Sequence, residues 1–263
     1  MERIPHYRVP AMATTTGPPY TKGAVNRAGR LCAATMRAVR EKDRAGLAQV
    51  DMEEFVDAIA LIVWWRGEHA YPLRMASANL RHYAPPEPAG KVPVTQRLKR
   101  FGTIVDKLHR EPTMELTQMA DVGGVRALLP DQEHADAVLR RLKKNWDVRR
   151  VRDYVETPKP SGYRAIHLIV RKKSRLIEVQ LRTPLQDIWA NNVEDDSRRL
   201  RVGYKSGVGD QAVHDYYVAM SELFALRERG EEPDTTFGAR LNELARAARP
   251  YLASPPTRGA QKP

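Results

Sequence analysis

Two carboxylates lie in apolar segments that the sequence predicts as neighbouring strands. Asp121 opens the segment Asp121-Val122-Gly123-Gly124-Val125-Arg126, and Glu178 lies within residues 175–182. Side chains alternate along a strand, so Glu178, Gln180 and Arg182 would share one face, opposite a face made of Ile177, Val179 and Leu181. Carboxylate oxygens bind Mg²⁺, and a carboxylate can take the proton of an attacking hydroxyl. The alternatives are a capping aspartate beside a bulge and a solvated strand face.

A loop rich in proline and glycine, residues 158–167, runs into the next predicted strand. Lys159 can offer a point charge to a phosphate. Tyr163 can offer a ring for a base to stack on. His167, four residues later, would share the face of Tyr163 on the strand. Together they indicate a ligand-binding loop, against the alternative of a histidine that only satisfies a structural hydrogen bond.

A basic segment, residues 97–107, precedes these strands. If residues 95–110 form a helix, Arg97, Arg100 and Lys107 fall on one broad face. The chain has no Gly-x-x-x-x-Gly-Lys-Ser/Thr motif, so phosphates would be held by side chains and not by a P-loop. The segment is either such a phosphate clamp or a solvated basic helix.

The elements that would position these residues follow from the hydrophobic periodicity. Helices are predicted over 24–48, 51–66, 95–110, 135–144, 184–200, 210–229 and 237–248, with Asp51 as the N-cap of the second. Strands are predicted over 122–129, 148–155, 163–172 and 175–182, the last two joined as a hairpin at Lys173-Ser174. This order predicts an α+β fold with a mixed β-sheet core flanked by N- and C-terminal helices.

The expected domain ranges follow from the same pattern. Residues 1–23 are expected to be a flexible arm, 24–94 an N-terminal helical region that ends in a linker over 83–93, and 95–205 the core. Residues 206–253 are expected to form C-terminal helices, and residues 254–263 a flexible tail. The chain is expected to fray from Pro250 onward.

The charge balance restricts the class of partner. The 263 residues include 44 Lys and Arg against 32 Asp and Glu, a formal charge of +12, which favours anionic partners such as nucleic acid or nucleotides. The single cysteine, Cys32, excludes an intrachain disulfide and a cysteine zinc site. No apolar run is long enough to span a bilayer and no signal peptide is visible, so a cytoplasmic location without membrane contact is expected.

The chemistry-bearing segments, in this order, resemble the synthetase domain of the RelA/SpoT family, the (p)ppGpp or alarmone synthetases, over about residues 95–205. The resemblance implies a nucleotidyltransferase-like sheet. It also implies transfer of the β,γ-pyrophosphate of ATP to a ribose 3′-hydroxyl, with release of AMP and with Mg²⁺ as cofactor.

The resemblance also assigns roles by position. The ATP-binding residues would be Arg97 and Arg126, which would sandwich the adenine, with Lys99, Thr103 and Lys107 near the phosphates. Asp121 and Glu178 would be the catalytic and metal-binding carboxylates. The acceptor-binding residues would be Lys159, Tyr163, which would stack on the base, His167, Gln180 and Arg182. Glu194 would match a carboxylate on the following helix.

The acceptor stays open between two classes. Ser161, Asp195 and the displaced Tyr204-Lys205 depart from the housekeeping pattern, and residues 181–226 resemble the small toxic members of toxin–antitoxin and phage-associated loci. Some of those modify the 3′-CCA end of tRNA, and an antitoxin or immunity protein often neutralises them. The acceptor is therefore GTP, GDP or another purine nucleotide, or else tRNA, and a homo-oligomer is also compatible with the sequence.

The basic residues of 27–40 and 140–152 bear on this choice. They could hold tRNA phosphates, or they could be the solvated face of a nucleotide enzyme. A third hypothesis is a non-catalytic module that binds nucleic acid or an antitoxin, which would not need Asp121 and Glu178 together. The His-Asp pair His214-Asp215 is expected on a helix surface, so the family's hydrolase domain is not expected.

Overall fold

The computed structural model describes residues 20–84, 92–204 and 207–253. These residues form two compact units. Unit 1 holds the described residues up to Gly67 together with Arg100–Met119, and unit 2 holds Glu68–Lys99 together with the described residues from Ala120 onward. Unit 1 thus includes part of the range predicted as the core.

Unit 1 is helical. It comprises α1 (Lys22–Glu41), α2 (Arg44–Ala48), α3 (Met52–Gly67), α5 (Phe101–Arg110) and the 3₁₀ turn η1 (Leu116–Gln118). Asp51 Oδ1 accepts hydrogen bonds from the backbone of Glu53 and Glu54, which confirms its predicted role at the start of α3. The helix predicted over 24–48 is split at Lys42, whose φ of 55° ends α1 in the left-handed region.

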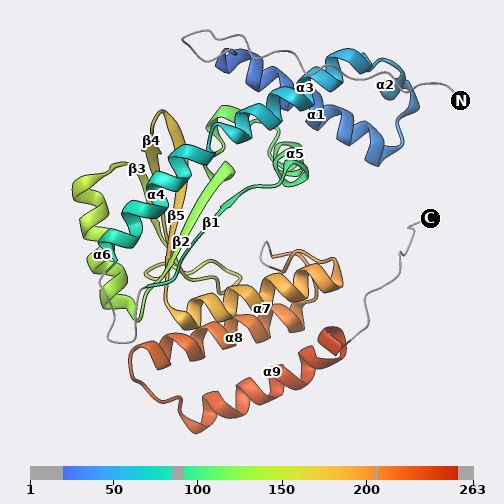
Figure 1. The fold of residues 1–263 in the computed structure, drawn as a ribbon. Coiled ribbons are helices and arrows are strands. Elements are labelled where there is room, and N and C mark those ends of the chain that lie inside the picture. The colour runs from blue at the N-terminus through green and yellow to red at the C-terminus, as the bar shows by residue number, and fades with distance from the viewer. Residues whose placement is uncertain (1–19, 85–91, 205–206, 254–263) are drawn as a thin grey trace, which may run out of the picture. The chain divides into compact units, whose positions relative to one another are not determined.

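Unit 2 is built on a five-stranded mixed sheet (Figure 1). Its strands are β1 (Val94–Leu98), β2 (Gly123–Leu128), β3 (Asp147–Asp153), β4 (Ile166–Lys172) and β5 (Arg175–Arg182), in the order β1-β2-β5-β4-β3. The β2–β5 pair is parallel and the other pairs are antiparallel. Lys173 and Ser174 both have positive φ, as a type I′ hairpin turn requires, and Lys172 pairs with Arg175, which confirms the predicted β4–β5 hairpin.

One face of the sheet is apolar and is covered by α4 (Ala70–Tyr83) and α6 (Gln132–Asn145) (Figure 1). Ile177, Val179 and Leu181 of β5 are fully buried there, with Leu80 of α4 and Leu142 of α6. The predicted division of β5 into an apolar and a polar face is therefore confirmed, and the polar side chains are left for the opposite face.

The chain reaches β2 through the 3₁₀ turn η2 (Ala120–Val122) and leaves β5 into the C-terminal helices. These are α7 (Pro184–Leu200), α8 (Gln211–Glu228) and α9 (Thr235–Ala253), and they enclose a second apolar cluster that includes Tyr163, Trp189 and Tyr217. The predicted α+β class, with a mixed sheet flanked by helices, is confirmed. No described helix is long and apolar enough to span a bilayer.

Several predicted elements are wrong in detail. Residues 94–98 form a strand because they pair with β2, so Arg97 does not share a helix face with Arg100 and Lys107. The strand predicted from Tyr163 begins only at Ile166. Helix α9 continues through Pro250 to Ala253, where fraying was expected. Predictions for residues 1–19, 85–91 and 254–263 lie outside the described residues.

Candidate active site

The polar face of the sheet carries two cross-strand rows of side chains. Residues opposite one another in a β-ladder point to the same face. One row runs Arg97, Gly124, Glu178, Ile169 and Arg150, and the next runs Thr95, Arg126, Gln180, His167 and Arg152. A Cβ built on Gly124 would have no neighbour within 4 Å, so the position beside Glu178 is open. The strand register thus brings together five residues predicted for the site: Arg97, Arg126, His167, Glu178 and Gln180.

Glu178 belongs to a closed ring of five hydrogen-bonded side chains. His167 Nδ1 lies 3.1 Å from Glu178 Oε1, and Gln180 Nε2 donates to Glu178 Oε2 at 2.7 Å. Arg182 Nη2 donates to Gln180 Oε1 at 3.0 Å and to Tyr163 Oη at 2.8 Å. The contact of Tyr163 Oη with His167 Nε2, at 2.6 Å, closes the ring. The ring fixes the direction of the carboxylate.

The donors in the ring set the tautomer of His167. Arg182 can only donate, so the Tyr163 oxygen accepts and its hydrogen points to His167 Nε2. Nδ1 then carries the proton and donates to Glu178. Burial lowers the pKa of His167, although the adjacent Glu178 raises it in part. A neutral imidazole therefore holds the carboxylate.

Asp187 compensates the positive charge of Arg182, a member of the ring. The Arg182 side chain is 0% exposed, and its Nη1 donates to Asp187 Oδ1 at 3.0 Å. The same oxygen accepts from Arg126 Nη1 at 2.9 Å. Burial is the main cause that lowers the pKa of Arg126, followed by the charge of Arg182, while Asp187 and Glu194 partly offset this. Asp187 lies in the first turn of α7, and the sequence reasoning missed it.

Lys99 and Asp121 form an ion pair just outside the strands, with Lys99 Nζ 2.8 Å from Asp121 Oδ2. Both side chains are largely buried. Asp121 lies in the turn η2 and not in the strand that it was predicted to open. Two residues predicted for the phosphates and the metal are therefore in direct contact.

The donor set for a metal ion is small. The described residues contain no group of three or more His, Cys, Asp or Glu side chains suited to one. Mg²⁺ is nevertheless commonly bound by one or two carboxylates plus substrate phosphates and water. Asp121 and Glu178 offer the hard oxygen ligands that this arrangement needs, so the residues fit an ion that binds together with a nucleotide.

The structure argues against the base-stacking role predicted for Tyr163. Its side chain is 1% exposed, and burial raises the pKa of its hydroxyl. Its ring makes edge contacts with Tyr154 and Trp189, and Arg182 and Lys159 both lie over it. The ring therefore has no open face in this conformation, and the chemical contribution of Tyr163 is its hydroxyl.

The remaining predicted residues are not members of this ring of hydrogen bonds. Thr103 and Lys107 are on α5 in unit 1, where Thr103 Oγ1 donates to the backbone oxygen of Arg100. Lys159 is in the loop before β4, with Nζ 4.6 Å from the centre of the Tyr154 ring. Glu194 is half-buried on α7.

Comparisons with known proteins show what the chain is similar to. Residues 96–205 match the family model described as "Region found in RelA / SpoT proteins". Over 110 residues the chain is 36% identical to "GTP pyrophosphokinase YwaC" of Bacillus subtilis, a match that covers 36% of this chain and 52% of that protein. It is 33% identical over 109 residues to "GTP pyrophosphokinase YjbM" of the same organism, over 37% of this chain and 52% of that protein. The match thus spans about half the length of these relatives.

Among solved structures, the fold resembles the small alarmone synthetase 1 from Bacillus subtilis, described as bound to its product pppGpp. The likeness covers 73% of this chain and 99% of that one, with a TM-score of 0.50 and 24% identity, and it bears on the fold alone. Over residues 96–205, the chain therefore carries the region found in RelA/SpoT proteins, the family that its motifs resemble.

Proposed function

We propose that the protein is a pyrophosphokinase that transfers the β,γ-pyrophosphate of ATP to the ribose 3′-hydroxyl of a purine nucleotide, so that it makes an alarmone. The observation that carries this proposal is the carboxylate of Glu178, which the ring of five hydrogen-bonded side chains holds on the polar face of the sheet. Its relatives named GTP pyrophosphokinase support the same reaction class.

The reaction needs a base for the acceptor hydroxyl. The 3′-oxygen attacks the β-phosphorus, the bond from that phosphorus to the α,β-bridging oxygen breaks, and AMP leaves. Glu178 takes the proton of the hydroxyl. A carboxylate offers about four acceptor positions, and the hydrogen bonds from His167 and Gln180 use two of them while aiming the group.

The open position at Gly124 suits the nucleoside of ATP. Arg97 is opposite Gly124, and Arg126 lies two residues further along the same face, so the two arginines are diagonal neighbours on adjacent strands. Such neighbours lie about 7–8 Å apart. This spacing admits a flat base between two guanidinium planes, because each stacked contact needs about 3.5 Å.

The Lys99–Asp121 pair would meet the phosphates of ATP. Charge develops on phosphate oxygens during the transfer, and cations stabilise it. Asp121 and Glu178 would hold Mg²⁺, which when bound neutralises part of this charge. Lys99 supplies a positive charge beside the Asp121 carboxylate. The phosphate-binding roles of Thr103 and Lys107, which lie on α5, stay predictions.

The loop before β4, residues 158–165, is called the acceptor loop below. It supplies Lys159, which is proposed to bind an acceptor phosphate.

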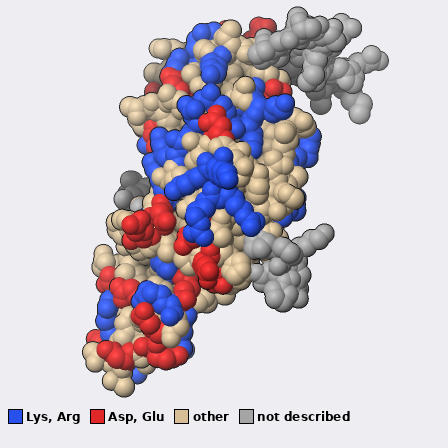
Figure 2. All heavy atoms as spheres, turned by 90° about the vertical axis from the view of Figure 1, so that its left-hand side faces the viewer, with Lys and Arg blue, Asp and Glu red and all other residues tan. Residues whose placement is uncertain are grey.

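A tRNA acceptor is the second candidate, and one observation favours it. Exposed basic side chains gather where α6 ends and β3 begins, and Figure 2 shows Lys and Arg side chains clustered on this side of the protein. The residues are Arg140, Arg141, Lys143, Lys144, Arg149, Arg150 and Arg152. Such a surface would give salt-dependent binding of a phosphate backbone.

Label transfer separates the candidates. The protein is incubated with Mg²⁺ and ATP labelled at the γ-phosphate, together with GDP or GTP, ADP, or deacylated tRNA. Label in a guanine or adenine nucleotide acceptor supports alarmone synthesis, and label in tRNA supports the second candidate. Absence of transfer to every acceptor contradicts the enzymatic proposal and favours the non-catalytic binding module.

A growth-inhibiting role and a neutralising antitoxin stay predictions. Induced expression in bacteria tests the first, with Glu178→Gln as the matched control. Growth arrest by the wild type and not by Glu178→Gln is expected, and equal growth of both cultures would contradict toxicity.

A further inference from the structure

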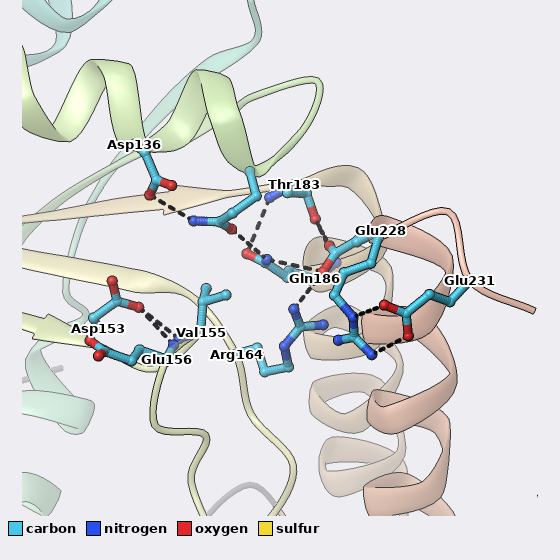
Figure 3. Close-up of polar contacts among 11 residues, drawn as sticks. Asp136, Asp153, Val155, Glu156, Arg164, Thr183, Gln186, Glu228 and Glu231 are labelled. Carbon is cyan, nitrogen blue, oxygen red and sulfur yellow. Dashed lines mark hydrogen bonds and ion pairs between the residues drawn. The ribbon is translucent and has the colours of Figure 1, made fainter. Parts of the chain in front are cut away.

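Glu228, the last residue of α8, places a buried carboxylate between two segments of the candidate site (Figure 3). Its Oε2 lies 2.6 Å from Arg164 Nη2, and the exposed fractions of the two side chains are 8% for Glu228 and 10% for Arg164. Its Oε1 accepts a hydrogen bond from Thr183 Oγ1. Gln186 Nε2 also reaches Oε2, at 3.5 Å. One carboxylate therefore joins the acceptor loop, the start of α7 and the end of α8.

The residues that Glu228 holds are the chain neighbours of two ring members. Arg164 follows Tyr163, and Thr183 follows Arg182. Tyr163 Oη and Arg182 Nη2 are themselves hydrogen-bonded at 2.8 Å. A shift of either segment would change this bond and, through His167, the position of the Glu178 carboxylate.

Helix α8 also supports the loop sterically. Gly162 has a φ of 86°, and a Cβ there would lie 3.1 Å from Val218 Cα and 3.2 Å from the backbone oxygen of Tyr217. A side chain at this position would be strained both by its conformation and by this contact. The loop is therefore packed against the middle of α8 and tied by charge to its end.

We propose that Glu228 is a positioning residue for the acceptor loop. It keeps Arg164 against α8, which holds Tyr163 where its hydroxyl completes the ring. Arg164 is almost fully removed from water, so without a counter-charge its guanidinium would favour a solvated position and draw the loop outward. The inference rests on the proposed function for its catalytic consequence, but the placement of the loop can be measured without any activity.

Hydrogen–deuterium exchange of Glu228→Gln tests the placement. The matched control is Glu222→Gln, which removes an exposed carboxylate of the same helix that pairs with Arg240. We expect Glu228→Gln to speed exchange in peptides that cover residues 158–167 and 183–187 on the order of ten-fold, while β2 and α1 keep wild-type rates. The control should match the wild type throughout.

Kinetics then test the consequence for the reaction. With Glu228→Gln, kcat/KM for the acceptor should fall about ten- to a hundred-fold, while KM for ATP stays at the wild-type value. Glu228→Asp keeps the charge on a shorter side chain, so its kcat/KM for the acceptor should lie between those of the wild type and Glu228→Gln. It replaces Glu228→Gln if that variant does not fold.

Two results would overturn the inference. One is wild-type exchange in residues 158–167 of a folded variant at position 228. The other is a uniform rise in exchange across unit 2 with equal losses for ATP and acceptor, which would mean general destabilisation. If the wild type transfers no label at all, the proposed function fails, while the exchange result still decides whether Glu228 positions the loop.

Discussion

His167 and Glu178, on adjacent strands β4 and β5, are joined by a hydrogen bond of 3.1 Å between Nδ1 and Oε1. The other nitrogen of His167 is held by the hydroxyl of Tyr163 at 2.6 Å. The proposed base is therefore aimed by a neutral histidine, which is in turn fixed by a residue of the acceptor loop.

The hydroxyl of Tyr163, and not its ring, is expected to matter. Tyr163→Phe keeps the ring but leaves Arg182 and His167 each without one hydrogen-bond partner, so the free energy of unfolding should fall by about 1–3 kcal/mol. The transfer rate should fall with it, because the Glu178 carboxylate is less well aimed. Urea unfolding and initial rates measure both quantities. Wild-type activity of Tyr163→Phe would instead support the stacking role.

The two adjacent glycines of β2 should respond in opposite ways to substitution. Gly124→Val places a side chain in the open position beside Glu178, where no atom lies within 4 Å of the new Cβ. Stability should be unchanged or raised, since β-branched residues favour strands. KM for ATP should rise about ten-fold or more, which is about 1.4 kcal/mol of binding.

The control for this test is Gly123→Ala, which faces the core. Its Cβ would lie 2.8 Å from Ile177 Cδ1. The free energy of unfolding should fall by about 1 kcal/mol from overpacking, with little change in KM for ATP. A wild-type KM for ATP in Gly124→Val would contradict the placement of the nucleoside over this strand.

Acid should destabilise the fold through His167. Burial lowers the folded-state pKa of this residue below its ordinary value of 6.5, so the unfolded chain binds the proton more readily. The contribution of the neutral histidine to stability is complete above about pH 6.5 and is lost as the pH falls through the lowered folded-state pKa. Unfolding free energies measured between pH 5 and 8 should therefore fall more steeply toward acid for the wild type than for His167→Gln. Parallel curves would contradict a buried neutral histidine.

Asp121→Asn should weaken the use of Mg²⁺. The substitution removes a hard ligand and leaves the Lys99 ammonium without the charge it pairs with at 2.8 Å. The Mg²⁺ concentration for half-maximal rate should rise at least about ten-fold. Asp147→Asn, at an exposed ion pair with Arg149, is the control and should titrate like the wild type. An unchanged Mg²⁺ requirement in Asp121→Asn would remove Asp121 from the metal site.

The polar face of β5 could be predicted from the sequence because alternation is a local signal. The hairpin at Lys173-Ser174 and the span of α7 follow from similarly local signals, a short turn and a proline at the helix start. Strand β1 was missed because it lies at the sheet edge, where three of its five residues are exposed and the apolar alternation is weak. Its pairing with β2 depends on residues far along the chain.

The site was predictable only in its parts. Helix α4 was missed because His69 provides no side-chain cap and Pro72 in its first turn resembles a breaker. Asp187 and Glu228 carry no motif, and their roles follow from buried partners, Arg182 and Arg164, that only the packing reveals. The burial of the Tyr163 ring could not be predicted for the same reason, since the sequence does not show that Trp189 of α7 packs against it.

The central claim is that Glu178 is the base for pyrophosphate transfer. The most direct measurement follows the transfer of pyrophosphate from γ-labelled ATP to the acceptor that the wild type uses. It compares the wild type with Glu178→Gln and with Glu243→Gln, an exposed control on α9. Glu178→Gln should fold normally and lose about 10²–10⁴-fold in rate, while Glu243→Gln keeps the wild-type rate. Transfer by a folded Glu178→Gln protein at the wild-type rate would contradict the account.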